Sequence, residues 1–331
     1  MAQVNSKAIY LGVDLGGTKI MAGVLAPNNQ LLGRARNKTK AEHGESTVIS
    51  RVVRTVHEAL EDAGLTLEKV AVLGIGAPGP VDVESGVVRT APNLRWNNFP
   101  LGRILQDELK VPVTLENDVN AGAWGEHQVG AGRGFDDMLA VFIGTGIGGG
   151  LVLGGTLYRG HFGTAGEIGH TVIRADAPRG WRTVENCASR TSIANNLREL
   201  IRTNHPSVLT EITGGDLDKI RSRTLAQAIE KEDPLTLEVV QTGARYVGLA
   251  AANIVTILSL PCVVLGGGLV EALGGRFTRW VRDAFEANVF PAELREQCRI
   301  KTAQLGDDAG VIGAALLARQ RLGKAAVGSS K

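Results

Sequence analysis

Two glycine-rich turns that carry a hydroxyl side chain occur in the chain, and each joins two apolar runs of strand length. The first lies within residues 8–25 and the second within residues 139–160. Glycines in such turns let backbone amide groups approach a phosphate closely and form a nest for an anion. One such turn alone is explained as an ordinary hairpin, but the repetition favours phosphate binding. The residues concerned are Gly16, Gly17 and Thr18 in the first turn, and Gly144, Thr145 and Gly146 in the second.

A carboxylate directly precedes the first turn, at the end of the predicted strand. Asp14 can there hold a magnesium ion, directly or through its water ligands, against a transferred phosphate. An aspartate at a strand end also commonly caps a turn, so this residue alone leaves both roles open.

Two other glycine patterns match the GxGxxG form, at residues 144–149 and 74–79. A dinucleotide fingerprint requires that the glycine loop opens a helix. The first pattern leads into the strand-like residues 150–153 and the second into a turn that begins at Pro80. A Rossmann dehydrogenase is therefore disfavoured, and the chain contains no Walker A sequence.

Helix and strand signals alternate around the glycine turns. Apolar residues recur at helical spacing over 48–60, after Ser46–Thr47, which offers a helix N-cap. The apolar runs at 70–75 and 111–115 have the length of buried strands. This order predicts a layered α/β architecture, and the recurring turn predicts an internal duplication. The corresponding predictions in the second half are a helix at 235–258, a strand at 262–265, a glycine turn at 266–268 and a helix at 309–322.

The composition is that of an ordinary globular protein, with 44% hydrophobic and 21% charged residues among 331. At about 100–200 residues per domain, this length favours two domains, although a single domain is possible. Lys and Arg number 36 against 34 for Asp and Glu, and neither sign is concentrated anywhere. We therefore expect neither nucleic acid nor a membrane as a partner. Glycine is in excess, with 43 residues and no low-complexity tract, which indicates local structural roles.

The three cysteines, Cys187, Cys262 and Cys298, are widely separated. Their odd number and their spacing predict neither a disulfide framework nor a CxxC zinc pair, and favour a reducing compartment. The start of the chain lacks the apolar run of a signal peptide, and no run approaches the ~20 residues that span a bilayer. These observations together predict a cytoplasmic protein.

Six segments together resemble, in order, the motifs of the ROK family, which is named for repressors, open reading frames and kinases. They are LGVDLGGTKIMAGVL, IGAPGPVD, LENDVNAGAWGE, FIGTGIGGGLV, GTAGEIGH and VVLGGGL, and the resemblance spans roughly residues 8–320. It implies an α/β fold of the actin-like ATPase (ribonuclease H-like) type, with two duplicated lobes around a cleft. The implied smaller N-terminal lobe comprises residues 1–118 and about 310–331, and the larger C-terminal lobe comprises residues 119–309.

The resemblance implies ATP as phosphoryl donor, with Mg²⁺ held by Asp14 through water. Some family members use polyphosphate, and the two glycine turns accommodate either anion. The implied nucleotide-binding residues are Asp14, Gly16, Gly17, Thr18 and Lys19 in the first phosphate loop, Gly144, Thr145 and Gly146 in the second, and Gly266, Gly267 and Gly268 near the adenosine.

The segment LENDVNA supplies the candidate catalytic group. Asn117 and Asp118 follow a predicted buried strand and precede a predicted helix over 119–129, which is where α/β sheets form ligand clefts. Asp118 resembles the family's catalytic base, which accepts the proton of a sugar hydroxyl while that oxygen attacks the terminal phosphate. An aspartate at this position also makes a good helix N-cap, and Asp118 can serve as both.

The resemblance places the sugar on further polar residues, since hydroxyl recognition needs several acceptors. Glu167 and His170 of GEIGH match family residues that bind ring hydroxyls, and Glu185 matches a glutamate that closes the zinc loop. Asn93 matches a further hydroxyl-binding position, with Gly76 close by and Asn117 beside the base.

The chain departs from the family at the zinc motif. Most members carry a CxCGxxGC cluster between the GEIGH histidine and this glutamate, whereas the interval here, TVIRADAPRGWRTV, has no cysteine. Cys187 lies beyond Glu185, so His170 lacks thiolate partners and we predict no zinc site. We hypothesise that Trp181 replaces the zinc by packing this loop.

The predicted function is therefore ATP-dependent phosphorylation of a hexose at its 6-hydroxyl, with glucose expected first. Kinases of N-acetylmannosamine, N-acetylglucosamine, fructose or allose share these motifs, so the sugar stays open. A non-catalytic sugar sensor or a repressor is the alternative of another class, although no helix-turn-helix segment precedes the first turn and no face is basic. The resemblance also implies a homodimer.

Overall fold

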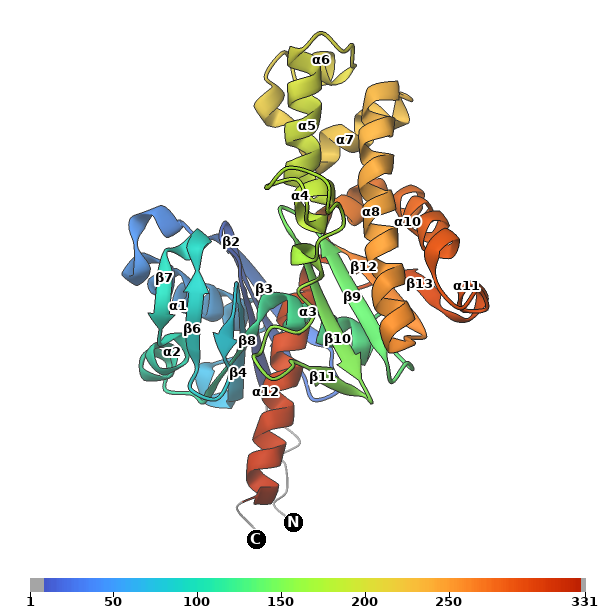
Figure 1. Ribbon diagram of the computed structural model, residues 1–331. Coiled ribbons are helices and arrows are strands. Elements are labelled where there is room, and N and C mark those ends of the chain that lie inside the picture. Colours follow the sequence, from blue (N-terminus) through green and yellow to red (C-terminus); the bar gives the residue numbers. More distant parts are fainter. Residues whose placement is uncertain (1–8, 329–331) are drawn as a thin grey trace. The chain divides into compact units, whose positions relative to one another are not determined.

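The computed structural model describes the backbone of residues 9–328 and the side chains of residues 9–323 (Figure 1). The chain forms two compact units. The first comprises the described residues up to Arg133, the short segment Leu157–Ala165 and the chain from Asp307 onward. The second comprises Gly134–Thr156 and Gly166–Gly306. No helix in the described part of the chain has both the length and the apolar character that a membrane crossing requires.

The first unit is built on a five-stranded sheet with the order β3-β2-β1-β4-β8. The strands β1, β2 and β3 are antiparallel neighbours, whereas β1, β4 and β8 are parallel. The hairpin expected at residues 8–25 is confirmed, because β1 and β2 are joined directly by the Gly16–Gly17 turn. The strand bounds are β1 (Ile9–Leu15), β2 (Lys19–Leu25), β3 (Leu31–Lys38), β4 (Val70–Ala77) and β8 (Val113–Asn117).

The second unit repeats this topology in the order β11-β10-β9-β12-β13. The hairpin β9–β10 is antiparallel, and β9, β12 and β13 are parallel, as are β1, β4 and β8. The chain passes from the second unit to the first within the edge strand β11. The matching strand orders confirm the internal duplication. The bounds are β9 (Met138–Ile143), β10 (Ile147–Leu153), β11 (Thr156–Tyr158), β12 (Cys262–Gly266) and β13 (Arg299–Thr302).

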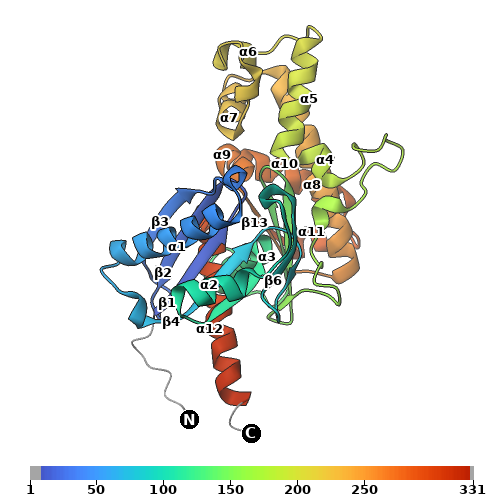
Figure 2. The same cartoon turned by 90° about the vertical axis from the view of Figure 1, so that its left-hand side faces the viewer.

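Helices cover both faces of the first sheet. The apolar side of α1 (Glu45–Asp62) packs with that of α2 (Leu101–Leu109) on the face of Leu11 and Val13 (Figure 2). The opposite face receives α12 (Ala309–Gly328), which also packs along α3 (Asp118–Val129). A small sheet of β5 (Val81–Asp82), β6 (Val87–Ala91) and β7 (Trp96–Phe99) completes this unit.

Two strand glycines explain part of the glycine excess. A Cβ atom on Gly12 would lie 1.9 Å from the carbonyl oxygen of Val311, and one on Gly74 would lie 2.0 Å from that of Ala314. Side chains alternate between the two faces of a strand, so both glycines face α12. Their missing side chains let the backbone of this helix lie directly on the sheet.

The second unit is mainly helical outside its sheet, and its core packs around the long helix α8, as expected at 235–258. Its helices are α4 (Val184–Ala188), α5 (Arg190–Arg202), α6 (Leu209–Ile212), α7 (Ser222–Glu230), α8 (Pro234–Leu258), α9 (Gly268–Leu273), α10 (Gly275–Asn288) and α11 (Leu294–Gln297). Short 3-10 helices along the chain are η1 (Ala41–His43), η2 (Leu67–Lys69), η3 (Pro92–Leu94), η4 (Ile168–His170), η5 (Leu217–Lys219) and η6 (Gly306–Asp308).

Some predicted boundaries differ from the structure. The expected N-cap at Ser46–Thr47 is wrong, because α1 already starts at Glu45 and the Thr47 hydroxyl donates to the His43 carbonyl instead. The lobe boundary was predicted at residue 118, whereas the first compact unit continues to Arg133, because α3 packs along α12. Helix α12 runs to Gly328, beyond the predicted 322. Residues 329–331 lie outside the described residues.

Candidate functional site

The ends of three neighbouring strands bring several predicted site residues together in the first unit. In the strand register, Asp14 of β1 lies opposite Gly76 of β4, and Gly76 lies opposite Glu116 of β8. Asn117 and Asp118 follow directly at the start of α3. Because the carboxyl ends of parallel strands share one sheet edge, Asp14 and Asp118 lie at the same edge.

Gly76 makes room for the backbone at Asp118. A Cβ atom on Gly76 would lie 3.2 Å from the Cα of Asp118 and 3.4 Å from the Cβ of Ala121. A side chain at this position would therefore push the first turn of α3 away from β4. Gly76 thus contributes to the site by its lack of a side chain, which lets α3 lie close to β4, and not by a polar contact.

The carboxyl group of Asp14 is strongly perturbed. Burial raises its pKa from 3.8 to about 7, with a further rise from the negative charge of Asp118 and a smaller one from Asp307, while the ammonium of Lys19 opposes the rise. The side chain lies against the start of α12, since a Cβ on Gly310 would come within 2.9 Å of its Cγ. A carboxyl group held near two other carboxylates is suited to binding a cation, which would stabilise its charged form.

The first glycine turn is supported by two side chains from elsewhere in this unit. The turn closes with a bond from the Gly16 N–H to the Lys19 carbonyl, at 2.9 Å. The buried Thr39 donates its hydroxyl to the Gly16 carbonyl at 2.6 Å, and its N–H bonds to the Thr18 carbonyl at 3.0 Å. A Cβ on Gly17 would lie 3.0 Å from the Cβ of Asn93. The predicted sugar residue Asn93 therefore lies against the predicted phosphate turn.

Lys19 is held by Asp307, an acidic residue that belongs to no sequence motif. Its ammonium pairs with Asp307, and Arg36 lies 3.6 Å from the other oxygen of that carboxylate. Lys19 and Asp307 are 288 residues apart in the sequence, so no local pattern signals their ion pair. Asp307 thus fixes the lysine beside the turn.

The first turn of α3 is capped by Asn117 and not by Asp118. The Asn117 Oδ1 accepts the N–H of Asn120 at 3.0 Å, and its amide donates to Asp118 Oδ1 at 3.0 Å and to the Gly79 carbonyl at 3.1 Å. Asp118 Oδ1 also accepts the N–H of Val119 at 2.9 Å. The N-cap role considered for Asp118 is therefore wrong, and Asn117 orients its carboxylate.

In the second unit, the second glycine turn is joined to the start of α5. The Gly144 N–H bonds to the Gly146 carbonyl at 2.9 Å, and the Arg190 N–H bonds to the Gly144 carbonyl at 3.0 Å. The Arg190 guanidinium donates to the Thr145 hydroxyl at 2.9 Å. Burial, and then the positive charge of Arg221, lower the pKa of Arg190. A guanidinium at this turn, with a second one in electrostatic reach of it, favours an anion. No sequence motif signals either arginine.

The triple-glycine segment lies beside this second turn. Gly266 pairs in register with Phe142, at the end of β9. Gly267 has φ +88, and a Cβ there would lie 2.6 Å from the Ile143 carbonyl oxygen. Only a glycine adopts this conformation and this packing without strain. Parallel pairing of β9 and β12 thus brings Gly266–Gly268 to the turn at Gly144–Gly146.

Three residues predicted to bind the sugar lie near the start of β10: Glu167, His170 and Glu185. The carboxylate of Glu185 accepts the N–H of Ile147 at 2.8 Å, and a Cβ on Gly146 would lie 2.3 Å from this carboxylate. Gly169, between Glu167 and His170, packs against the Ile147 carbonyl. Glu167 and His170 are exposed, with 3.9 Å between carboxylate oxygen and imidazole Nε2.

The loop where the family's zinc motif would lie is closed by backbone hydrogen bonds. Val172 and Thr183 form a β-bridge, and the Arg182 carbonyl accepts from the N–H of Ile173 at 2.8 Å and of Arg174 at 3.1 Å. Trp181 is 40% exposed, and its carbonyl accepts a hydrogen bond from the Cys187 thiol at 3.2 Å. That its ring packs the loop in place of the zinc stays a prediction. No group of three metal-ligating residues comes together within the described ranges.

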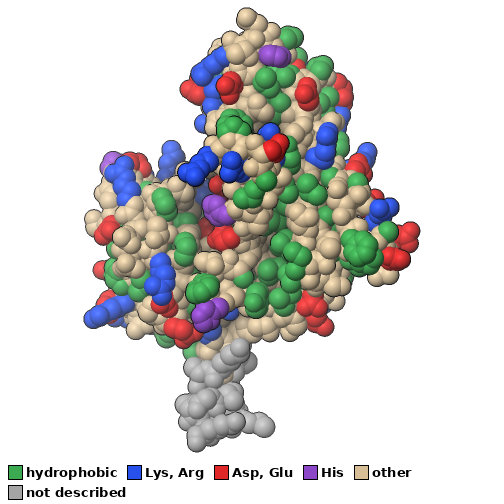
Figure 3. Space-filling model, viewed as in Figure 1, with side chains coloured by type: hydrophobic (Ala, Val, Ile, Leu, Met, Phe, Trp, Pro, Cys, Tyr) green, Lys and Arg blue, Asp and Glu red, His purple; other side chains and the backbone are tan. Residues whose placement is uncertain are grey.

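The face of the molecule drawn in Figure 3 is mixed in charge. Figure 3 shows Lys and Arg side chains interspersed with Asp and Glu over the visible face. This distribution agrees with a formal net charge of +2.

Comparison with known proteins agrees with these features. The ROK family profile matches residues 10–321. The glucokinase of Halalkalibacterium halodurans is 33% identical over 320 residues, which cover 94% of this chain and 95% of that protein. The glucokinase of Thermotoga maritima is 33% identical over 322 residues, which cover 96% and 99%.

A solved structure extends the comparison to the fold. The ROK family glucokinase from Streptomyces griseus, in complex with glucose and AMPPNP, matches with a TM-score of 0.84 at 31% identity. The match covers 95% of this chain and 100% of that one. The expected actin-like ATPase fold is thereby confirmed.

Proposed function

Because the chain belongs to the ROK family, we propose that it transfers the terminal phosphoryl group of ATP to the 6-hydroxyl of a hexose, with glucose as the first substrate. The observation that carries this proposal is the common sheet edge of Asp14 and Asp118, beside a glycine turn that is held by Thr39 and accompanied by Lys19. Relatives named glucokinase, and one solved with glucose and the ATP analogue AMPPNP, support the choice of sugar and donor.

In this proposal Asp118 is the general base. Its Oδ1 is held by the Asn117 amide and the Val119 N–H, which fixes the direction of the carboxylate. It accepts the proton of the sugar hydroxyl while that oxygen attacks the phosphorus. Phosphoryl transfer depends mainly on positioning and charge neutralisation, so a well-oriented carboxylate in hydrogen-bond reach suffices.

In this proposal the glycine turn of each unit is a phosphate-binding element. Backbone N–H groups at Gly16–Thr18 and Gly144–Gly146 supply donors, and Lys19 and Arg190 supply positive charge. The negative charges of Asp118 and Asp307 near Asp14 favour a cation there, and the Asp14 carboxylate would hold Mg²⁺ through water. When bound, Mg²⁺ neutralises charge on the phosphate oxygens. The adenosine is assigned to the segment Gly266–Gly268, which lies beside the second turn.

The sugar hydroxyls are assigned to polar side chains, of which Asn93, Glu167 and His170 are exposed and Asn117 and Glu185 half-buried. In the first unit these are Asn93 and Asn117, with Gly76 as spacer, and in the second Glu167, His170 and Glu185. The retained hydrogen-bond acceptors suit a polyol, since an unpaired buried hydroxyl is costly. We propose that no zinc is required, because backbone bonds already close the loop at Val172–Thr183.

The three cysteines are all free thiols. Burial raises the pKa of Cys262 to about 11 and that of Cys298 to about 12, so both stay protonated and unreactive. Free, neutral thiols are typical of a reducing compartment, and we place the activity in the cytoplasm. We also propose a homodimer, which light scattering of the purified protein would test.

A coupled assay of ADP release with Mg-ATP tests the proposal. The panel contains glucose, mannose, fructose, allose, N-acetylmannosamine and N-acetylglucosamine, with polyphosphate as a second donor. Turnover with glucose as the best sugar is expected. A higher kcat/KM for an N-acetylated sugar would reassign the substrate. If the folded protein turned over no sugar with either donor, it would instead be a sensor or a repressor.

A further inference from the structure

A buried carboxylate lies directly before the proposed catalytic residues. Glu116 is the penultimate residue of β8, only 3% exposed, and is followed by Asn117 and Asp118. A buried carboxylate is tolerated only where cations and hydrogen bonds compensate its charge. The partners of Glu116 therefore determine whether this end of the strand stays in place.

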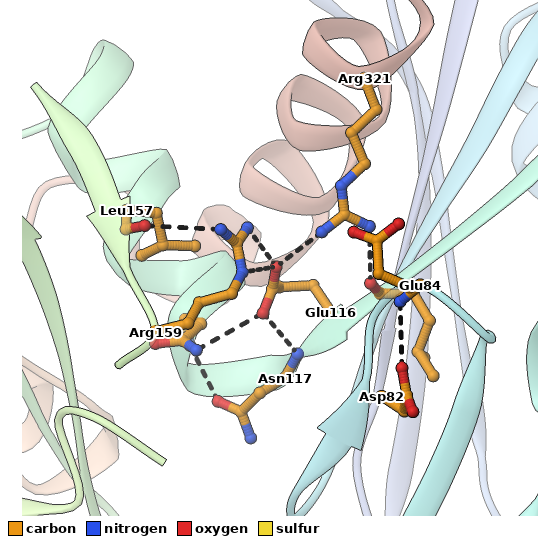
Figure 4. Close-up of polar contacts among 9 residues, drawn as sticks. Asp82, Glu84, Glu116, Asn117, Leu157, Arg159 and Arg321 are labelled. Carbon is orange, nitrogen blue, oxygen red and sulfur yellow. Dashed lines mark hydrogen bonds and ion pairs between the residues drawn. The ribbon is translucent and has the colours of Figure 1, made fainter. Parts of the chain in front are cut away.

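The two oxygens of Glu116 have different partners (Figure 4). Oε2 accepts two bonds from Arg159, from Nε at 2.8 Å and from Nη2 at 2.6 Å, and a longer one from Arg321 at 3.3 Å. Oε1 instead accepts the N–H of Asn117 at 3.2 Å and the amide of Asn120 at 3.4 Å. One carboxylate thus links two guanidinium groups to the first turn of α3.

The two arginines come from distant parts of the first unit. Arg159 lies in the segment Leu157–Ala165, which the chain contributes to this unit between two passages through the second. Arg321 lies on α12 and also donates to the Leu115 carbonyl at 3.0 Å. The Arg159 side chain is 29% exposed and the Arg321 side chain 27%, so both are partly shielded from water.

Arg159 makes the shorter and more numerous bonds to Glu116. Without it, Oε2 would keep only the 3.3 Å contact with Arg321. A buried carboxylate that loses its main cation either takes up a proton or shifts toward water. Either change would alter the bonds of Oε1 to Asn117 and Asn120, and with them the turn that presents Asp118.

We propose that Arg159 is a positioning residue for the general base, acting through Glu116 on the first turn of α3. The proposal rests on the proposed kinase function for its catalytic consequence, and on the contacts of Glu116 for its structural one. Displacement of a catalytic group by about 1 Å is enough to cost ~10²-fold in rate.

The kinetic test compares Arg159→Met with Arg89→Met. Arg89 lines the same cavity of about 620 Å³ as Arg159 and Arg321 but pairs with Asp82 at 2.7 Å. We expect Arg159→Met to lower kcat by ~10²-fold with little change in either KM, and Arg89→Met to behave as the parent protein. Arg159→Lys keeps the charge without the forked donors and should lie between the two.

A double-mutant cycle shows whether Arg159 acts through Glu116. In Glu116→Gln the carboxylate charge is absent, so Arg159→Met added to it should lower kcat little further. If the two losses multiply, or if Arg159→Met alone leaves kcat unchanged, the proposal is overturned. Because the cavity is open to solvent, added guanidinium should also restore part of the kcat lost in Arg159→Ala, in proportion to its concentration.

An activity-independent measurement separates this proposal from the proposed function. Hydrogen exchange of the amides at 117–121 should accelerate in Arg159→Met and stay unchanged in Arg89→Met. If the protein phosphorylated no sugar, the kinase proposal would fail while this measurement still decided the positioning role. Unchanged exchange in Arg159→Met would refute that role whatever the activity.

Discussion

The carboxylate of Glu185 accepts the backbone N–H of Ile147 at 2.8 Å, and so supports the second glycine turn from the strand side. The family resemblance predicts this glutamate as a sugar ligand. Its contacts indicate a second role, because the same carboxylate packs against Gly146 of the predicted phosphate turn.

This contact predicts that Glu185→Ala impairs the use of ATP as well as of sugar. Loss of the acceptor leaves the Ile147 N–H without its partner, which costs roughly 1–3 kcal/mol. The KM for ATP should therefore rise, by at most the corresponding ~5- to 150-fold. Glu185→Gln retains an acceptor oxygen and should affect ATP less. Steady-state kinetics at varied ATP and varied glucose provide the check, and a change confined to the sugar KM would contradict the second role.

Replacement of the proposed base tests the chemistry directly. Asp118→Asn preserves the size of the side chain and an oxygen acceptor for the Val119 N–H, so the fold and sugar binding should persist. We expect kcat to fall by ~10²–10⁴-fold, the usual contribution of general base catalysis. Calorimetric titration with glucose serves as the control. If kcat stayed within a few-fold of the parent value, Asp118 would not be the base.

Arg190 is expected to contribute to phosphate binding. Its guanidinium donates to Thr145 and lies near Arg221, so replacement removes positive charge beside the second turn. We expect Arg190→Met to raise the KM for ATP about tenfold, which corresponds to about 1.4 kcal/mol. Arg202→Met, at the exposed C-terminal end of the same helix, is the matched control. Equal effects of the two substitutions on the KM for ATP would contradict a local role.

The raised pKa of Asp14 makes stability depend on pH. Its pKa is about 7 in the folded protein against 3.8 as the ordinary value, so the folded state binds the extra proton between these limits. This extra proton adds at most about 4 kcal/mol to the free energy of unfolding. The contribution is fully present below about pH 4 and is lost as the pH rises through 7.

Asp14→Asn should remove this dependence. The variant is expected to melt at a higher temperature than the parent protein at pH 8, with little difference near pH 4, and to be inactive as a kinase. Thermal unfolding without Mg²⁺ across this range is the measurement. A variant that melts lower at pH 8 would show that the Asp14 carboxylate stabilises the fold.

Zinc removal should leave the activity intact. Backbone bonds between residues 172–174 and 182–183 close the loop without cysteine ligands. Dialysis against a zinc-selective chelator, followed by assay at saturating Mg²⁺, should preserve kcat. Loss of activity that returns with added zinc would contradict this expectation.

The local elements were largely predictable from the sequence. Both glycine turns, the buried strands and the long helix at 234–258 follow from apolar periodicity and glycine position, which depend on neighbouring residues. The N-caps of helices α1 and α3 were not predicted correctly. Ser46–Thr47 and Asp118 have the right residue type, but Gly44 precedes α1 and Asn117 caps α3.

The sequence by itself determined the family, the internal duplication and the residue types at the two glycine turns, because motifs and periodicity are encoded locally. Only the tertiary structure decided the partners of these residues. Lys19 with Asp307, Thr145 with Arg190, and Glu116 with Arg159 are separated by 288, 45 and 43 residues. Such pairs depend on how crossover connections and α12 return to the sheets, and no pattern of neighbouring residues specifies that return.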